Sequence, residues 1–128
     1  MAGTLTISQL SDGTNSTSST NCIQGSAKAW VNFTNSTGTT IVVNASYNVS
    51  SVTASATSDY TINFTNALSD AKYAITGMAG AGSLNGAFLV NPINQTANTS
   101  SAFRIKSLYQ DNGLAGTVPQ AVSVSVFR

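Results

Sequence analysis

The side chains that most often carry enzyme chemistry are scarce in this sequence of 128 residues. It contains no histidine and no glutamate, so the commonest proton shuttle is absent. The aspartates Asp59 and Asp70 are the best candidates for a catalytic carboxylate pair. Both stand in turn-like segments, where aspartate usually accepts hydrogen bonds from its own backbone. A serine nucleophile would have only lysine or aspartate as its base. We therefore predict that the protein is not an enzyme and has no catalytic residue.

Metal and cofactor sites are also disfavoured. One cysteine, Cys22, and no histidine exclude an ordinary zinc site, and we interpret this cysteine as a buried or incidental thiol. A calcium loop at residues 11–15 would supply one carboxylate, which makes a weak site. The glycine-rich residues 77–86 lack the following helix that a phosphate-binding loop requires. We predict no metal and no cofactor.

The composition excludes further classes of function. Charged residues make up 7% of the chain and the net charge is +1, without a basic run, so nucleic-acid binding by phosphate neutralisation is not expected. Serine, threonine and asparagine supply more than a third of the residues. The uncharged hydrogen-bonding surface that they form is not screened by salt and suits a large assembly. The chain has no apolar run long enough to span a membrane and begins without signal-peptide features, so we expect neither membrane insertion nor export.

Alternation of apolar and polar residues predicts the secondary structure. The pattern is clearest at residues 27–33 and 60–65, where successive side chains would point to opposite sides of an extended chain. Other strands are predicted at residues 3–8, 40–47, 49–57, 72–76, 87–90, 103–109 and 118–127. Helix is limited to single turns at residues 69–71 and 111–115, and residues 77–86 are expected to form a turn.

Many short strands with Gly, Asn and Ser turns between them predict an all-β fold. The architecture expected is an antiparallel, jelly-roll-like β-sandwich of about seven to nine strands. Residues 1–25 form an N-terminal strand and polar arm, and residues 26–128 form the sandwich domain. Residues 11–20 contain no apolar side chain and are interpreted as a loop or extended arm. Such an arm can order itself on a neighbouring subunit, which we state as a hypothesis.

Two aromatic residues are candidates for an oligomer interface. Trp30 lies on the Lys28 and Asn32 side of its strand, opposite Val31. A core tryptophan is the default interpretation, and an anchor in an interface is the alternative. Phe127 stands beside the last residue of the sequence, which suggests that this segment is docked, either on its own domain or on another copy.

Residues 27–77, which begin AKAWVNFTNSTGTT, resemble a module of small structural and tail-fibre proteins of tailed bacteriophages, especially marine and cyanobacterial phages. The resemblance rests on residues 27–33, 45–46, 48–52, 59–64, 67–73 and 122–127, and on the opening MAGTLT. Residues 53–59, TASATSD, depart from the family's glycine-containing turn. The resemblance implies a β-sandwich that assembles as a homo-oligomer, a homotrimer being expected, at the outside of a phage particle.

Two functions follow from this resemblance. The first is host-surface recognition by a tail-fibre-type domain that binds a surface glycan or protein. The second is a purely structural role as a capsid decoration or cement protein, or as a fibre adaptor. Both imply synthesis in the host cytoplasm, a location in the virion, and contacts with other virion proteins. The loops at residues 35–38, 77–86 and 91–100 are expected to face outward, with the receptor-contact candidates Asn35, Gly38, Asn85, Asn94 and Gln95.

Overall fold

The fold is all-β and antiparallel, as the alternation predicts. A computed structural model describes residues 3–35, 40–56, 58–80, 88–92, 98–110, 114–115 and 120–128. Nine of the described strands form one hydrogen-bonded sheet with the order β4-β3-β11-β7-β8-β9-β6-β5, and β10 pairs with β9. Their bounds are β3 (Ala27–Asn35), β4 (Ile41–Tyr47), β5 (Val49–Ala56), β6 (Asp59–Phe64), β7 (Ala74–Gly80), β8 (Phe88–Pro92), β9 (Ala102–Gln110), β10 (Leu114–Ala115) and β11 (Ala121–Phe127).

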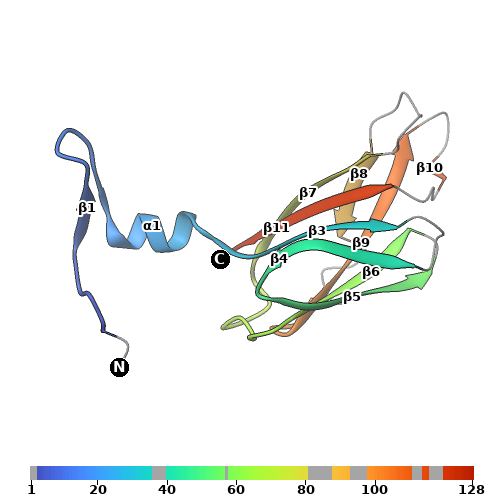
Figure 1. Cartoon of the computed structure of the whole chain (residues 1–128), viewed down its shortest axis with the longest axis horizontal. Helices are drawn as coiled ribbons and strands as arrows, with labels where there is room; N and C mark the ends of the chain where they lie inside the picture. The colour runs from blue at the N-terminus through green and yellow to red at the C-terminus, as the bar shows by residue number, and fades with distance from the viewer. Residues whose placement is uncertain are drawn as a thin grey trace.

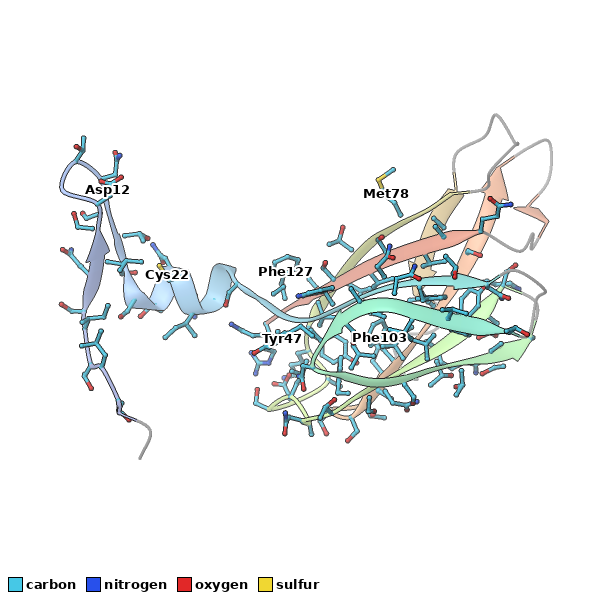
Figure 2. All side chains as sticks on the ribbon, viewed as in Figure 1. Asp12, Cys22, Tyr47, Met78, Phe103 and Phe127 are labelled. Carbon is cyan, nitrogen blue, oxygen red and sulfur yellow. The ribbon has the colours of Figure 1, made fainter. Side chains whose placement is uncertain are left out.

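The sheet folds over at the junction of β7 and β8 to make a sandwich of two layers (Figure 1). One layer is β4-β3-β11-β7, and the other is β8-β9-β6-β5. Their inner sides meet in a single core, where the rings of Phe33 and Tyr60 from opposite layers lie 5.0 Å apart. Figure 2 shows Phe103 between the layers. The buried apolar residues are Ala29, Val31, Phe33, Val52, Tyr60, Ile62, Phe64, Phe103, Ile105, Val122, Val124 and Val126.

The period-two pattern explains why this core forms. In β3 the odd-numbered residues 29–33 are buried, and in β11 the even-numbered residues 122–126 are buried. The two strands pair so that Val124 lies opposite Val31 and Val122 lies opposite Phe33. One face of each strand therefore faces the core and the other faces outward.

Asn48 makes the tight corner between β4 and β5. Its φ of 53° lies in the left-handed region, which asparagine tolerates better than most residues. Its amide Nδ2 donates to the backbone oxygens of Lys28 and Asn66, each at 3.1 Å, and its Oδ1 accepts from the Asn66 backbone N–H at 2.8 Å. One side chain thus joins three segments at this end of the sandwich.

The N-terminal arm lies outside the sandwich. It contains β1 (Gln9–Ser11), β2 (Ser16–Ser18) and α1 (Ser19–Gly25), and β1 pairs with β2 alone. Figure 1 shows the arm extending away from the layers, with α1 between the β1–β2 hairpin and β3. In the described part of the chain, no helix has the length and apolar character needed to cross a membrane.

The arm corrects three sequence-based expectations. Residues 11–20 are not simply a loop, because they hold most of the β1–β2 hairpin. The helix α1 was not predicted. Ser18 caps it, its hydroxyl accepting the Asn21 backbone N–H at 3.1 Å. Residues 3–8, predicted as a strand, have no partner strand in the single chain, and pairing begins only at Gln9.

Three further local expectations are wrong. Residues 77–80 do not begin a turn, because β7 continues through Gly77 to Gly80, while residues 81–87 lie outside the described residues. The segment 114–115, predicted as part of a helical turn, pairs with β9 as β10. Residues 69–71 form bends and not a helical turn.

We predict that Gly77→Ala destabilises the fold. An added Cβ would lie 2.6 Å from the backbone oxygen of Ser123 and 3.2 Å from the Val124 side chain, so β7 and β11 would have to move apart. The expected loss in the free energy of unfolding is roughly 1–3 kcal/mol, measured by urea denaturation. Gly80→Ala is the matched control, because a Cβ there meets nothing within 4 Å. Equal stability of the two variants would contradict the close packing of β7 against β11.

We also predict that stability falls at alkaline pH through Tyr73. Burial raises the pKa of its phenol to about 12, above the ordinary value of 10. Below pH 10 the phenol is protonated in both the folded and unfolded states. Between pH 10 and 12 only the unfolded state readily loses the proton, so the free energy of unfolding decreases with rising pH.

The variant Tyr73→Phe tests this cause. Its ring retains the contacts with Phe64 and Phe103, at centroid distances of 5.8 and 6.1 Å. It loses the hydroxyl, which donates to the backbone oxygens of Thr99 and Ala102. We expect a loss of about 1 kcal/mol at pH 7 and a weaker decline above pH 10. An unchanged alkaline decline would contradict the assignment to Tyr73.

Candidate functional site: an aromatic sheet face and a detached arm

The outward side of the layer β4-β3-β11-β7 exposes large apolar side chains. Trp30 lies between Tyr47 on β4 and Ser125 on β11 in the paired register. Trp30 is 39% exposed and Tyr47 is 58% exposed, and Met78 on β7 projects into solvent (Figure 2). The single chain thus gives Trp30 an exposed position and not the core position that was the default expectation. We call the following residues the outer face: Lys28, Trp30, Asn32, Tyr47, Thr76, Met78, Ser123, Ser125 and Phe127.

A chain of uncharged hydrogen bonds crosses the outer face beside Trp30. The amide of Asn44 on β4 donates to Asn32 Oδ1 at 2.8 Å, and Asn32 Nδ2 donates to Ser123 Oγ at 2.7 Å. Three neighbouring strands are therefore linked by side chains as well as by backbone. These groups can also hydrogen-bond a partner without the salt dependence of an ion pair.

Phe127 occupies one end of the outer face. It lies opposite Ala74 of β7, and Figure 2 shows its ring pointing away from the sheet toward the side of the arm. The next residue, Arg128, forms an ion pair with Asp70. The pKa of the Asp70 carboxyl lies below its usual value, mainly because the carboxylate accepts a hydrogen bond from the Lys72 backbone N–H. Arg128 lowers this pKa further. These contacts fix the end of β11, and Phe127 is half-buried in the single chain.

The N-terminal arm is the second surface with exposed apolar side chains. Leu5 is 82% exposed and Ile23 is 64% exposed, and Leu10 and Ile7 are exposed as well. Together with Cys22 they line an open hollow of about 380 Å³ between residues 5–10 and α1. Cys22 is a free, half-buried thiol. The arm thus carries an apolar side that nothing in the described single chain covers.

Asn35 does not match its predicted role as a receptor contact. It is 1% exposed at the end of β3, and its amide donates to the Tyr60 hydroxyl at 3.0 Å. Burial is also the main cause that raises the pKa of Tyr60. Asn35 therefore joins the two layers from inside, and its side chain is not available to a ligand in the single chain.

The other predicted contact residues, Gly38, Asn85, Asn94 and Gln95, lie outside the described residues. The described residues that flank these loops are placed by the strands. Asn35 and Gly80 end their strands at the side away from the arm, where Thr34 and Gly80 flank Ala121. Residues 98–101 lie at the opposite end, where the Ser101 and Ser100 oxygens accept the backbone N–H groups of Phe64 and Leu68. The described residues next to the predicted loops therefore lie at two different ends of the sandwich.

The two aspartates considered as a catalytic pair have separate partners. Asp59, at the start of β6, accepts from Arg104 Nη2 at 2.6 Å. Asp70 pairs with Arg128 at the other end of the sandwich. Each carboxylate is held by an arginine, so the two do not form a pair with each other.

Asp12 has a local role in the β1–β2 hairpin. Its Oδ1 accepts the backbone N–H groups of Asn15 at 2.7 Å and Thr14 at 2.9 Å, which lowers the pKa of the carboxyl. This carboxylate, the one that the loop 11–15 could offer to calcium, is thus used by the turn itself. Over the described ranges, no group of three or more His, Cys, Asp or Glu side chains could hold a metal ion.

Comparisons with protein-family models, with curated proteins and with solved structures found no match.

Sequence reasoning missed the apolar side of the arm, although a signal for it exists. Ile23 lies 13 residues after Leu10, and residues 11–20 between them contain no apolar side chain. The Ser18 cap, three residues before Asn21, is the local signal for α1, and α1 is what brings Ile23 back beside Leu10. When residues 11–20 are interpreted as one loop, α1 is not recognised, and the proximity of Ile23 to Leu10 cannot be predicted.

We predict that the fluorescence of Trp30 reports coverage of the outer face. Trp30 is the one tryptophan of the chain. If copies cover this face, raising the protein concentration shifts the emission to shorter wavelength and reduces quenching by iodide. N-acetyl-tryptophanamide in the same buffers is the control. An emission that stays constant while the particle mass rises would show that assembly leaves Trp30 uncovered.

Proposed function

We propose that this chain is a structural protein of a bacteriophage virion, a tail-fibre-type homotrimeric β domain at the particle surface that engages the host surface. The resemblance of residues 27–77 and 122–127 to phage structural modules supports the setting. The observation that carries the proposal is the division of the chain into an uncovered apolar arm and a separate sandwich. Such a division fits a protein that is attached to the particle through its arm and exposes its sandwich at the particle surface.

The arm supports attachment. Burying a leucine or isoleucine side chain stabilises a contact by about 1.5–3 kcal/mol, and the arm exposes several of them. A seven-residue helix and a hairpin whose two strands have three residues each have little stability of their own. Contact with a neighbouring subunit would supply the missing burial. The arm is therefore the part that joins the particle.

The sandwich supports display and recognition. The outer face carries one charged residue, Lys28, beside the aromatic residues Trp30 and Tyr47 and the amide of Asn32. Aromatic rings and amides together bind glycans and proteins by stacking and hydrogen bonding. A surface of this kind works across a range of salt concentrations.

The alternative is a capsid decoration or cement protein, or a fibre adaptor. The same detached arm favours it, because an arm that reaches a neighbour can hold two subunits of a shell together. The two functions differ in where the protein lies on the particle and in what the exposed sandwich contacts.

We predict a mass of roughly three times 13.1 kDa for the native assembly by light scattering. Leu5→Ser, which removes an exposed apolar side chain of the arm, should shift the mass toward that of the monomer. Thr53→Ala, at an exposed position of β5, is the matched control and should leave the mass unchanged. A monomer for the unaltered chain at all concentrations would contradict the trimer.

The location in the virion tests the function directly. An antibody raised against the protein would label purified particles of the phage that encodes it, viewed by electron microscopy. Label at tail or fibre ends is expected for host recognition. Label spread over the capsid would favour the decoration role, and particles without label would overturn both.

A further inference from the structure

Two parts of this chain have the features of strands that lack a partner. One is residues 3–8 of the arm, and the other is the free edge of β4. They lie apart in the single chain, because the arm extends away from the sandwich (Figure 1).

Residues 3–8 have a strand sequence without a strand's hydrogen bonds. Leu5 and Ile7 alternate with Thr4, Thr6 and Ser8, which is the period-two pattern of a half-buried strand. Within the described chain, residues 3–7 make no hydrogen bond, and pairing with β2 begins at Gln9. All of residues 3–8 are exposed, including the side that would be buried in a sheet, and Leu5 is the most exposed large apolar residue of the described chain.

Among the described strands, β4 pairs with β3 alone, and its other edge has no partner. Apart from Ile41, every residue of β4 is exposed. Val43 lies opposite the fully buried Phe33, yet it is 42% exposed, because β4 is the last strand of its layer. The neighbouring Val42, on the opposite side of the strand, is exposed too. A further strand beyond β4 would cover both valines.

β4 has a β-bulge at Asn44, where the register with β3 shifts, but it lacks the other features that usually protect a free edge. Sheet edges in natural proteins are commonly blocked by lysine, proline or short strands. β4 has seven residues, Ile41–Tyr47, with no charged residue and no proline. The other free edge, β5, is mainly serine and threonine on its exposed positions. Of the two edges, β4 is the better acceptor for an apolar strand.

We propose that residues 3–8 of one copy add as a strand to the free edge of β4 in a second copy, with Leu5 and Ile7 on the side of Val43. This contact rests on the proposed homotrimer and describes how its copies would be joined. The strand supplies backbone hydrogen bonds to the edge, and its two apolar side chains extend the core layer. The lengths match, six residues against seven.

A second copy is the occupant that the charges favour. Neither residues 3–8 nor residues 41–47 contain a charged side chain, so identical chains meet here without repulsion. Each copy offers one donor strand and one acceptor edge. Repeating that head-to-tail contact gives a ring when the rotation between copies closes, and the proposed trimer is a ring of three such contacts.

Disulfide trapping between two different chains tests the exchange. In a Cys22→Ser background, one full-length chain carries Ile7→Cys and a second, tagged chain carries Val43→Cys. The two are mixed in denaturant, refolded together and oxidised, and the covalent heterodimer is measured on a non-reducing gel. Leu5→Cys in place of Ile7→Cys allows for a register shifted by two residues.

The control is Thr6→Cys mixed with Val43→Cys. Residue 6 points to the opposite side of the added strand, so the sulfurs lie too far apart to bond. We expect about tenfold more heterodimer with position 5 or position 7 than with position 6. Equal yields, or no heterodimer at either position, would overturn the strand exchange. If the strand exchange fails this test while light scattering still gives a trimer mass, the proposed function is not contradicted. Failure of the strand exchange can therefore be distinguished from failure of the proposed function.

Discussion

The register of β11 between β3 and β7 is the constraint on which the rest of this structure depends. It places Val122, Val124 and Val126 toward the core in every cross-strand pair. Because side chains alternate along a strand, the same register turns Trp30 of β3 outward beside Ser125. If β3 shifted by one residue in this register, Trp30 would face the core and Val31 would face outward. Gly77 fits the same constraint, since the backbone of β11 passes too close to β7 there for any side chain.

The low charge of the sequence has its structural counterpart on the outer face and at the edge of β4. The described ion pairs, Asp59 with Arg104 and Asp70 with Arg128, use four of the nine charged residues within the sandwich itself. The outer face is then mainly aromatic and amide in character with Lys28 as its one charged residue, the edge of β4 is uncharged, and the apolar side of the arm is not covered by the described chain. Each of these is poorly suited to a solitary chain and well suited to contact with other chains, which is why a role in assembly is the common element of the proposals.

The sequence predicts the sandwich well because its strands are defined by burial on one side. The apolar residues that alternate along residues 27–33 and 122–127 face the core in β3 and β11, and the residues between them face outward. Where burial does not decide the structure, the prediction was wrong. The arm depends on local caps such as Ser18 and on the turn held by Asp12. Glycine usually indicates a turn, and at Gly77 it instead permits a close strand contact.

The candidate site was harder to predict for a related reason. That Trp30 faces outward follows from its position in the alternation, but whether that side is covered depends on the layer as a whole. The burial of Asn35 depends on a hydrogen bond to Tyr60, 25 residues away, which joins two layers and leaves no mark on local sequence. Likewise, the local sequence of residues 3–8 is that of a strand, and only the three-dimensional structure reveals that this segment has no partner strand in the single chain.

Hydrogen exchange tests most directly the claim that neighbouring copies complete this chain. Amide exchange of residues 3–8 and of β4 would be measured by mass spectrometry at high and low protein concentration, with residues 60–64 of the core as an internal reference. If neighbours cover the arm and the edge, both segments exchange slowly in the concentrated sample and rapidly in the dilute one, while the core is unchanged. Rapid exchange of both segments at every concentration, in a sample whose mass shows an oligomer, would contradict the claim.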